Sequence, residues 1–514
     1  MHETANRQSG FNLPSFQPAT LSKKPRRYLV LAMAFSILEF LLFKFFYPCP
    51  DFLSDSYDFI SAASVRAGVG FLPIGYSNFL GAFHDLNLSD TALIAFQYFF
   101  YVFTASYFFS TIQSLFNPRK SASLILFSFL FVNPIFLYIS NCITSDSLVA
   151  SISLLWISQL LQIIHRPHFR QILITTVILF LLFALTNVFY YVIITIAVIL
   201  LSGFTLLAKL TGTALNCLCI GTFVILSLSL TKKETGTAQL SFSSGWQIAN
   251  NALYMRDYIT ADTVTLPTPE TRQLDNLAKS FFRHAGKNVT SYLIDNESNV
   301  FIQYSNSPLR KFYQLHYDPK NNYARLMDAG NASPIFATYG NYLIRNYPQD
   351  YFKYFLLKNL KNYFFPPLEQ LQTFHGTGKD IPALAQEWFD YQTPIISSKY
   401  ETAKIGIFSV FSYFFLLITI WYTGSLFLWI YKKRTLYLPK PLGPSVLLLN
   451  SYLIINFLHS IFSSTIGFRQ EIIALVVCTT FTIVTLEFLD KNEKSVDKTK
   501  IIPNKNAPEI SLTH

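Results

Sequence analysis

Residues 172–207 read ILITTVILFLLFALTNVFYYVIITIAVILLSGFTLL, and none of them is charged. At about 1.5 Å per residue, one helix of this length would measure about 54 Å, whereas the hydrocarbon core of a bilayer is about 30 Å thick. Basic residues flank the stretch on both sides, at Arg166, Arg170 and Lys209. Because short basic loops stay in the cytoplasm, both ends are expected to face that side. We therefore predict two crossing helices, which meet at Thr186-Asn187 on the outer side of the membrane.

Apolar blocks of similar length recur along the whole chain. Of its 514 residues, 51% are hydrophobic and 13% are charged, about half the charged share of a soluble protein. A single soluble core does not grow large enough to hide so much apolar surface. We predict a polytopic α-helical membrane protein with about ten transmembrane helices. The expected spans are 28–47, 91–112, 122–139, 146–164, 172–186, 187–207, 212–230, 403–431, 444–460 and 466–488.

The formal net charge of +11 comes from basic residues at the ends of these apolar blocks. A nucleic-acid-binding protein would instead gather its basic residues on one polar face, so nucleic acid is not an expected partner. The distribution follows the rule that short basic loops remain in the cytoplasm. We therefore expect an integral protein of the cell (inner) membrane, with both termini in the cytoplasm and membrane lipid around its helices.

The spans divide the chain into five regions. A cytoplasmic tail, 1–27, precedes a transmembrane module, 28–231, which contains a long polar outer loop, 48–90. Residues 232–402 lack a spanning block and form a domain outside the cytoplasm, mainly α or α+β. Its helical candidates are 268–284, 335–346 and 348–363. The final spans within 403–489 lead to a cytoplasmic tail, 490–514.

The outer loop 48–90 contains two carboxylates at an i,i+3 spacing, Asp55 and Asp58. If a helix begins near Asp55, both lie on one face of its first turn. Like charges held together raise one pKa, which suits a general base. The alternative is structural: Asp55 caps the helix and Asp58 is solvated in its first turn.

Two further polar features fall on the same side of the membrane. Asp146 stands at the outer end of the fourth span, where Ser145 or Asp146 would also serve as a helix N-cap. Arg469 and Glu471 stand at the outer mouth of the last span. Charged residues in membrane helices usually face the protein interior or a water cavity, and arginine binds phosphate well. The alternative is that this pair extends to the membrane surface.

These features carry a resemblance to the membrane-embedded GT-C glycosyltransferases, in the branch of the protein mannosyltransferases and lipid A aminoarabinose transferases. The first loop bears Asp55-Ser-Tyr-Asp58 and leads into FLPIGYSNFL over 71–80. The stretches NPIFL over 133–137, TSDSL over 144–148 and NVFYY over 187–191 are also similar to that branch. The resemblance covers about 28–230, and the rest only in layout.

Two departures from the branch stand out. The first-loop pair is Asp-x-x-Asp, whereas the protein mannosyltransferases have an adjacent Asp-Glu. Thr186 stands where relatives often place Arg. Either departure would fit an unusual substrate or a member that has lost activity.

The resemblance implies a particular reaction and a particular set of partners. Such enzymes move a sugar from a polyprenyl-phosphate carrier to an acceptor outside the cytoplasm, here a lipid, glycan or protein. Asp55 or Asp58 would deprotonate the acceptor hydroxyl, and Arg469 would hold the leaving phosphate, with Arg66 as a weaker candidate for that task. Supporting residues implied by the same layout are Asp146, Glu471 and Tyr76. Acidic loops of this family can also hold a divalent cation.

Two other classes of protein share these general features. A transporter or flippase of lipid-linked sugars would also be polytopic, but that class favours internal repeats and broken helices at mid-membrane. No clear repeat relates the two halves of this sequence. A non-catalytic membrane scaffold with an outer binding domain is the other alternative.

Overall fold

The computed structural model describes residues 23–285, 298–368, 380–396, 401–433 and 442–501, together with residues 294, 371, 398 and 399. Within this part of the chain the regular secondary structure is helical, and β structure is limited to two isolated bridges. The predicted helical fold class is confirmed, and the described part of 232–402 is mainly α. Most of the tails 1–27 and 490–514 and of the loop 432–443 lies outside the side chains that can be described.

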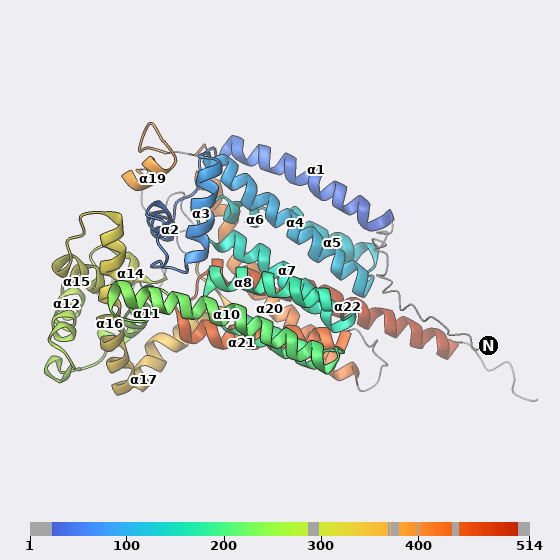
Figure 1. Cartoon of the computed structure of the whole chain (residues 1–514). Helices are drawn as coiled ribbons and strands as arrows, with labels where there is room; N and C mark the ends of the chain where they lie inside the picture. The colour runs from blue at the N-terminus through green and yellow to red at the C-terminus, as the bar shows by residue number, and fades with distance from the viewer. Residues whose placement is uncertain are drawn as a thin grey trace, which may run out of the picture.

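Nine helical stretches among the described residues are long and apolar enough to cross a membrane. The helices that form them are α1 (Lys23–Phe46), α4 (Asp90–Phe116), α5 with α6 (Lys120–Phe131 and Ile135–Ser140), α7 (Asp146–His165), α8 (Phe169–Thr186), α10 (Leu206–Thr235), α20 (Glu401–Lys433), α21 (Leu442–Ser463) and α22 (Ile472–Ile501). They form one elongated bundle (Figure 1). The chain is therefore a polytopic membrane protein, as predicted.

The stretch 172–207 is broken where the sequence indicated. Helix α8 ends at Thr186, and Asn187 adopts a left-handed conformation with φ of 56°. Asparagine tolerates this conformation better than most residues, and the Asn187 N–H still donates to the Phe183 carbonyl. The following helix α9 covers only Tyr190–Leu201, about 18 Å at the usual rise. The predicted span 187–207 is thus shorter than expected and does not reach across a membrane alone.

The predicted span 122–139 also contains a break, at Asn133-Pro134 between α5 and α6. Proline has no N–H to continue the helical hydrogen bonds, and it disfavours helical backbone at the residue before it. The Asn133 side chain accepts a hydrogen bond from the Ile135 N–H, which begins α6. The turn after α6 lies next to the outer loop, where the Asn141 carbonyl accepts a hydrogen bond from the Asp51 N–H.

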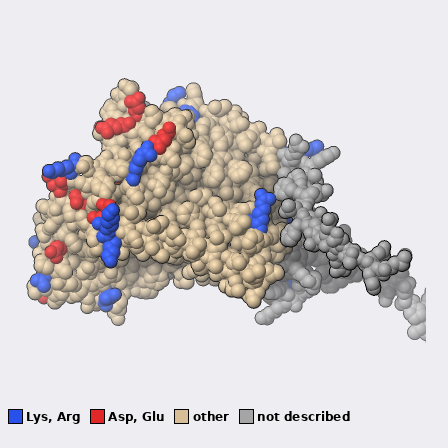
Figure 2. All heavy atoms as spheres, in the orientation of Figure 1, with Lys and Arg blue, Asp and Glu red and all other residues tan. Residues whose placement is uncertain are grey.

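The helices of the outer loop and of the segment 232–402 gather at one end of the bundle, which we call the polar end (Figure 1). They are α2 (Ser54–Ser64), α3 (Ile74–Leu86), α11 (Ser243–Arg256), α12 (Pro269–Ala285), α14 (Val300–Gln303), α15 (Pro308–His316), α16 (Asn322–Asn346), α17 (Pro348–Tyr351), α18 (Leu357–Phe364) and α19 (Ala383–Trp388). On the face drawn in Figure 2, charged side chains concentrate at this end, while the middle of the bundle is almost free of them. That distribution fits an apolar belt surrounded by lipid.

Two predicted helices of 232–402 differ from the structure. The candidate 335–346 is the second half of the longer helix α16, which contains Pro334. The candidate 348–363 is interrupted, because Phe352–Leu356 forms a π-helical turn between α17 and α18. In both cases neighbouring helices stabilise backbone that local sequence signals do not favour.

The outer loop and the segment 232–402 share one hydrophobic core. Phe71 of the loop packs edge-on against Trp246 of α11, with ring centroids 5.5 Å apart. The backbone is joined as well, since the Phe242 N–H donates to the Gly70 carbonyl. Within the segment, the buried Arg256 guanidinium binds both carboxylate oxygens of Asp275. The loop that carries Asp55 is therefore held from two sides, by the bundle and by this helical segment.

Candidate functional site

Arg469 joins two acidic residues that are far away in the sequence. Its Nη1 donates to Asp146 Oδ2 at 2.9 Å, and its Nη2 donates to Asp55 Oδ2 at 3.0 Å. Asp55 lies in the first turn of α2, and Asp146 is the first residue of α7. Arg469 lies in the short 3₁₀ helix Phe468–Glu471 that leads into α22. The structure thus brings three of the predicted site residues together at the polar end of the bundle.

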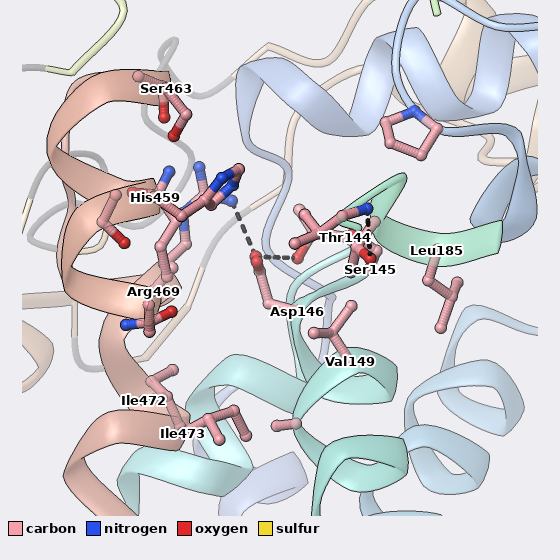
Figure 3. Close-up of a pocket in the computed structure, with 18 of the residues that line it drawn as sticks. Thr144, Ser145, Asp146, Val149, Leu185, His459, Ser463, Arg469, Ile472 and Ile473 are labelled. Carbon is pink, nitrogen blue, oxygen red and sulfur yellow. Dashed lines mark hydrogen bonds and ion pairs between the residues drawn. The ribbon is translucent and has the colours of Figure 1, made fainter. Parts of the chain in front are cut away.

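The three side chains line one cavity of about 330 Å³, in which Figure 3 labels Asp146 and Arg469. The Arg469 side chain is 8% exposed, against 29% for Asp55 and 19% for Asp146. Ion pairs at such partly buried positions are screened less by salt than pairs on an open surface. The guanidinium is the most enclosed of the three groups, so a ligand that enters the cavity reaches it beside the two carboxylates.

Asp146 does not cap its own helix. Ser145 is the N-cap residue of α7, and no side chain caps the first turn. The Asp146 carboxylate instead accepts hydrogen bonds from the Thr144 hydroxyl, at 2.7 Å, and from Arg469. Its position at a helix N-terminus still favours negative charge there. The expected capping role is therefore replaced by a role in orienting Arg469.

Asp58 is a predicted site residue of α2 that does not line the cavity. It is half-buried, and it is not among the residues that line the cavity with Asp55. Burial raises the pKa of Asp58 to about 6, the guanidiniums of Arg310 and Arg325 oppose that rise, and the Asp55 carboxylate adds to it. Burial, and not the neighbouring carboxylate, is thus the main cause of the raised pKa.

Two more predicted residues, Arg66 and Tyr76, do not line the cavity. The Arg66 guanidinium follows α2 and pairs with Asp85 at 2.6 Å on the exposed surface. The buried Tyr76 hydroxyl donates to Gln97 Oε1, and Gln97 Nε2 donates to the Ser140 and Cys142 carbonyls. These contacts give both residues structural roles, and the structure does not bring Arg66 to the cavity that contains Arg469.

Glu471 lies beneath the cavity, fully buried. Its Oε2 accepts from the Asn456 amide at 3.2 Å, and the Asn456 carbonyl oxygen accepts from the Tyr190 hydroxyl at 3.0 Å. Asn456 and Tyr190 both line the cavity. Glu471 therefore does not snorkel to the membrane surface; it orients polar groups of the cavity wall.

Three asparagines of the segment 232–402 hold the turn that precedes Arg469, at 461–468. The buried Asn359 amide donates to the carbonyls of Ile461 and Ser464, at 3.0 and 2.7 Å, and its oxygen accepts from the Ile466 N–H. Asn251 and Asn299 add hydrogen bonds to the backbone of Ser463 and the hydroxyl of Thr465, respectively. We call these three residues the asparagine clamp. Sequence reasoning missed it, because asparagines in a polar segment carry no local signal.

Another acidic residue of the outer loop, Asp51, forms its ion pair away from Asp55 and Arg469. Asp51 is buried and forms an ion pair with the buried Lys404 at the start of α20. Its backbone also pairs with the turn after α6, through the Ile143 N–H. Asp51 therefore fixes the loop to the bundle and is not placed with Asp55.

The described residues contain no group of three or more His, Cys, Asp or Glu side chains placed to hold a metal ion. Asp55 and Asp146 both bind the arginine that lies between them. This arrangement fits an anion at Arg469 better than a cation between the two carboxylates.

Comparison with known proteins adds no relative: no protein-family model, curated protein or solved structure matches the chain.

Proposed function

We propose that this chain is a membrane glycosyltransferase, which moves a sugar from a polyprenyl-phosphate carrier to an acceptor on the far side of the membrane from its termini. The observation that carries the proposal is the contact of Asp55 and Asp146 with Arg469 in one cavity. That cavity lies where the polar end meets the apolar bundle. A lipid-linked substrate would present its phosphate and sugar there while its chain remains in the membrane.

Each group in the cavity has a chemical task in this reaction. Asp55 accepts the proton of an acceptor hydroxyl as its oxygen attacks the anomeric carbon of the sugar. The bond between the anomeric carbon and the phosphate oxygen breaks, and the lipid phosphate leaves with the electron pair. The configuration at the anomeric carbon is inverted. Arg469 stabilises the charge that builds on the leaving phosphate through charge-assisted hydrogen bonds.

The ion pairs suggest an order of events. Asp55 and Asp146 each bind a different terminal nitrogen of Arg469. A donor phosphate brings a third anion to the same guanidinium and competes with the more exposed carboxylate, that of Asp55. Displacement from Arg469 would leave the Asp55 carboxylate facing the acceptor. Asp146, together with Thr144, would keep the guanidinium in place during the exchange.

The proposal is tested with purified protein in lipid vesicles and a panel of defined polyprenyl-phosphate sugars. We expect release of free polyprenyl phosphate that depends on an acceptor and disappears in Asp55→Asn. Movement of the intact lipid-linked sugar across the vesicle without cleavage would instead identify a flippase. If neither occurs with any donor, while the protein remains folded, the catalytic proposal is wrong and a scaffold role is supported.

A further inference from the structure

Helix α21 presents a row of polar side chains to the cavity. Asn456, His459, Ser460 and Ser463 all line it, and their spacing of three and four residues places them on one helix face. The rest of α21 is largely apolar, as expected for a membrane helix. Polar side chains in such a helix usually face a polar cavity or a partner. We call these four residues the α21 wall.

Hydrogen bonds fix the Asn456 end of the wall. Asn456 is 5% exposed, and three neighbours fix its amide: Tyr190 donates to its oxygen, and its nitrogen donates to Glu471 and contacts the Tyr363 hydroxyl at 3.5 Å. The Tyr190 ring also packs edge-on against the His459 ring, with centroids 5.3 Å apart. The orientation of His459 is therefore set by an aromatic neighbour, which is itself held by Asn456.

The outer end of the wall has hydrogen-bonding capacity that the protein does not use. Within the described part of the chain, neither the His459 ring nor the Ser463 hydroxyl forms a hydrogen bond to another residue. Both side chains border the cavity that holds Arg469, and both are labelled with it in Figure 3. Polar groups kept at a cavity surface without a protein partner are available to a ligand.

Another part of the cavity lining has a different character. Apolar side chains line it, among them Val149, Leu185 and Ile473. The cavity thus offers three distinct surfaces: an arginine for an anion, an apolar side for a hydrocarbon, and the α21 wall with several donors and acceptors. Only a ligand that combines an anionic group with several hydroxyl or amide groups would use all three.

We propose that the α21 wall binds the glycosyl unit of the donor, and that His459 and Ser463 determine which sugar is accepted. This inference rests on the proposed function and deepens it. A site built to hydrogen-bond a substrate hydroxyl discriminates strongly against a ligand without it, because its polar groups are then left unpaired. The wall would therefore recognise the sugar, and Arg469 would bind the phosphate, which all donors have in common.

Two probes separate these roles: a short-chain polyprenyl phosphate, and the same lipid phosphate esterified to a sugar that the wild-type protein binds most tightly. Binding to purified protein is measured directly by calorimetry. We expect His459→Ala and Ser463→Ala to weaken binding of the glycosylated probe about tenfold each, the usual effect of one lost hydrogen bond to a ligand. Binding of the unglycosylated probe should change by less than about twofold. Arg469→Ala should weaken both probes.

A matched control is His284→Ala, because His284 is exposed on α12, away from the cavity; it should change neither affinity. If the wild-type protein prefers the glycosylated probe and both wall variants keep that preference, the inference is overturned and the proposed function stands. Wild-type protein that binds neither probe would overturn both. Wall variants that lose both probes equally, while their thermal stability is unchanged, would assign the wall to the phosphate and also overturn the inference.

Discussion

At the scale of single residues, α2 gives its two carboxylates different surroundings. Asp55 points into the cavity toward Arg469, whereas Asp58 lies half-buried on the side where Arg310 and Arg325 act on it. The i,i+3 spacing suggested one shared task for the pair. The helix is wide enough that two residues of its first turn meet different neighbours, so Asp55 lines the cavity and Asp58 does not.

We therefore expect Asp55→Asn and Asp58→Asn to differ in activity. Asparagine keeps the shape of either carboxylate but cannot accept a proton from the acceptor hydroxyl. General-base catalysis typically contributes a factor of about 10² to 10⁴, so Asp55→Asn should lower kcat by at least about a hundredfold. Asp58→Asn should retain most of it. Release of polyprenyl phosphate under saturating donor measures both, and equal losses in the two variants would contradict the assignment.

Asp58 should instead affect stability in a pH-dependent way. Its pKa is raised from 3.8 to about 6 in the folded protein, which corresponds to at most about 3 kcal/mol. Because the folded form holds the proton more tightly, stability is highest below about pH 4 and falls as the pH rises through 6. Asp58→Asn should remove this fall. Thermal melts in detergent from pH 4 to 8 should show a wild-type Tm that drops relative to the variant. Parallel curves would contradict the prediction.

The positions of some of these residues could be predicted from topology, whereas the contacts of others depend on packing between helices. Topology alone placed Asp55, Asp146 and Arg469 at one end of the bundle, because each stands at the same end of a spanning segment. The partner of Arg66 could not be predicted in that way. Arg66 takes a left-handed conformation with φ of 47° directly after α2, and this turn directs the chain toward Asp85. Such a turn depends on the packing of α2 against α3.

At the scale of helices, the break between α8 and α9 positions one side of the cavity. Thr186 and Tyr190 stand on either side of the break, and both line the cavity. Helix α8 is fixed at this point by close packing, since a side chain at Gly75 of α3 would collide with the Ala184 backbone at 2.6 Å. The sequence predicted this break from length and from the polar pair. It did not predict that α9 would end at Leu201, because Gly203 is the one residue between 201 and 207 that disfavours a helix, and a single glycine does not end one reliably.

The conformation of Asn187 leads to a prediction about stability. A left-handed backbone costs a residue with a Cβ about 1 to 2 kcal/mol, and glycine almost nothing. Asn187→Gly should leave the Tm nearly unchanged, while Asn187→Ala should lower stability by about 1 kcal/mol. The glycine variant serves as the control, because both substitutions remove the same amide. Similar Tm values for the two variants would show that backbone conformation is not the determining factor.

The asparagine clamp should couple the segment 232–402 to the position of Arg469. Asn359→Ala removes the amide that binds the turn at Ile461, Ser464 and Ile466, and it leaves buried backbone groups unsatisfied at about 1 to 3 kcal/mol. We expect a lower Tm and a donor KM raised about tenfold, because Arg469 loses its fixed position, with the acceptor KM unchanged. Asn346→Ala is the matched control, since that exposed side chain donates its hydrogen bond to Tyr342 of its own helix. A lower Tm with an unchanged donor KM would contradict the positioning role.

At the scale of the whole molecule, hydropathy predicted the spanning helices, but it could not predict the structure of the segments outside them. Long apolar blocks fix the number and approximate position of spanning helices, since each must satisfy its backbone internally in lipid. The segment 232–402 has no such constraint. Its helices depend on a core shared with the outer loop, in which Trp246 packs against Phe71 and Phe336. Contacts of this kind are long-range and cannot be derived from local pattern.

The structure assigns chain segments to the two ends of the bundle, and charge indicates which end is cytoplasmic. Helix α20 begins at the polar end, where Lys404 binds Asp51, and runs through Lys433, about 50 Å at the usual helical rise. The basic residues of the short loops lie at the end opposite the polar end: Arg119, Lys120, Arg166, Arg170 and Lys209. The positive-inside rule therefore predicts that this opposite end faces the cytoplasm.

Single cysteines at Lys232 and Lys433 test this orientation in a variant without the five native cysteines. Lys232 is exposed near the end of α10, next to the segment 232–402. An impermeant thiol reagent added to intact cells should label Lys232→Cys, whereas Lys433→Cys should react only after the membrane is opened. Labelling of both from one side would contradict the parity of the spans. The reverse pattern would place the cavity in the cytoplasm, where an acceptor outside the cell could not reach Asp55, and the proposed reaction would lose its substrate.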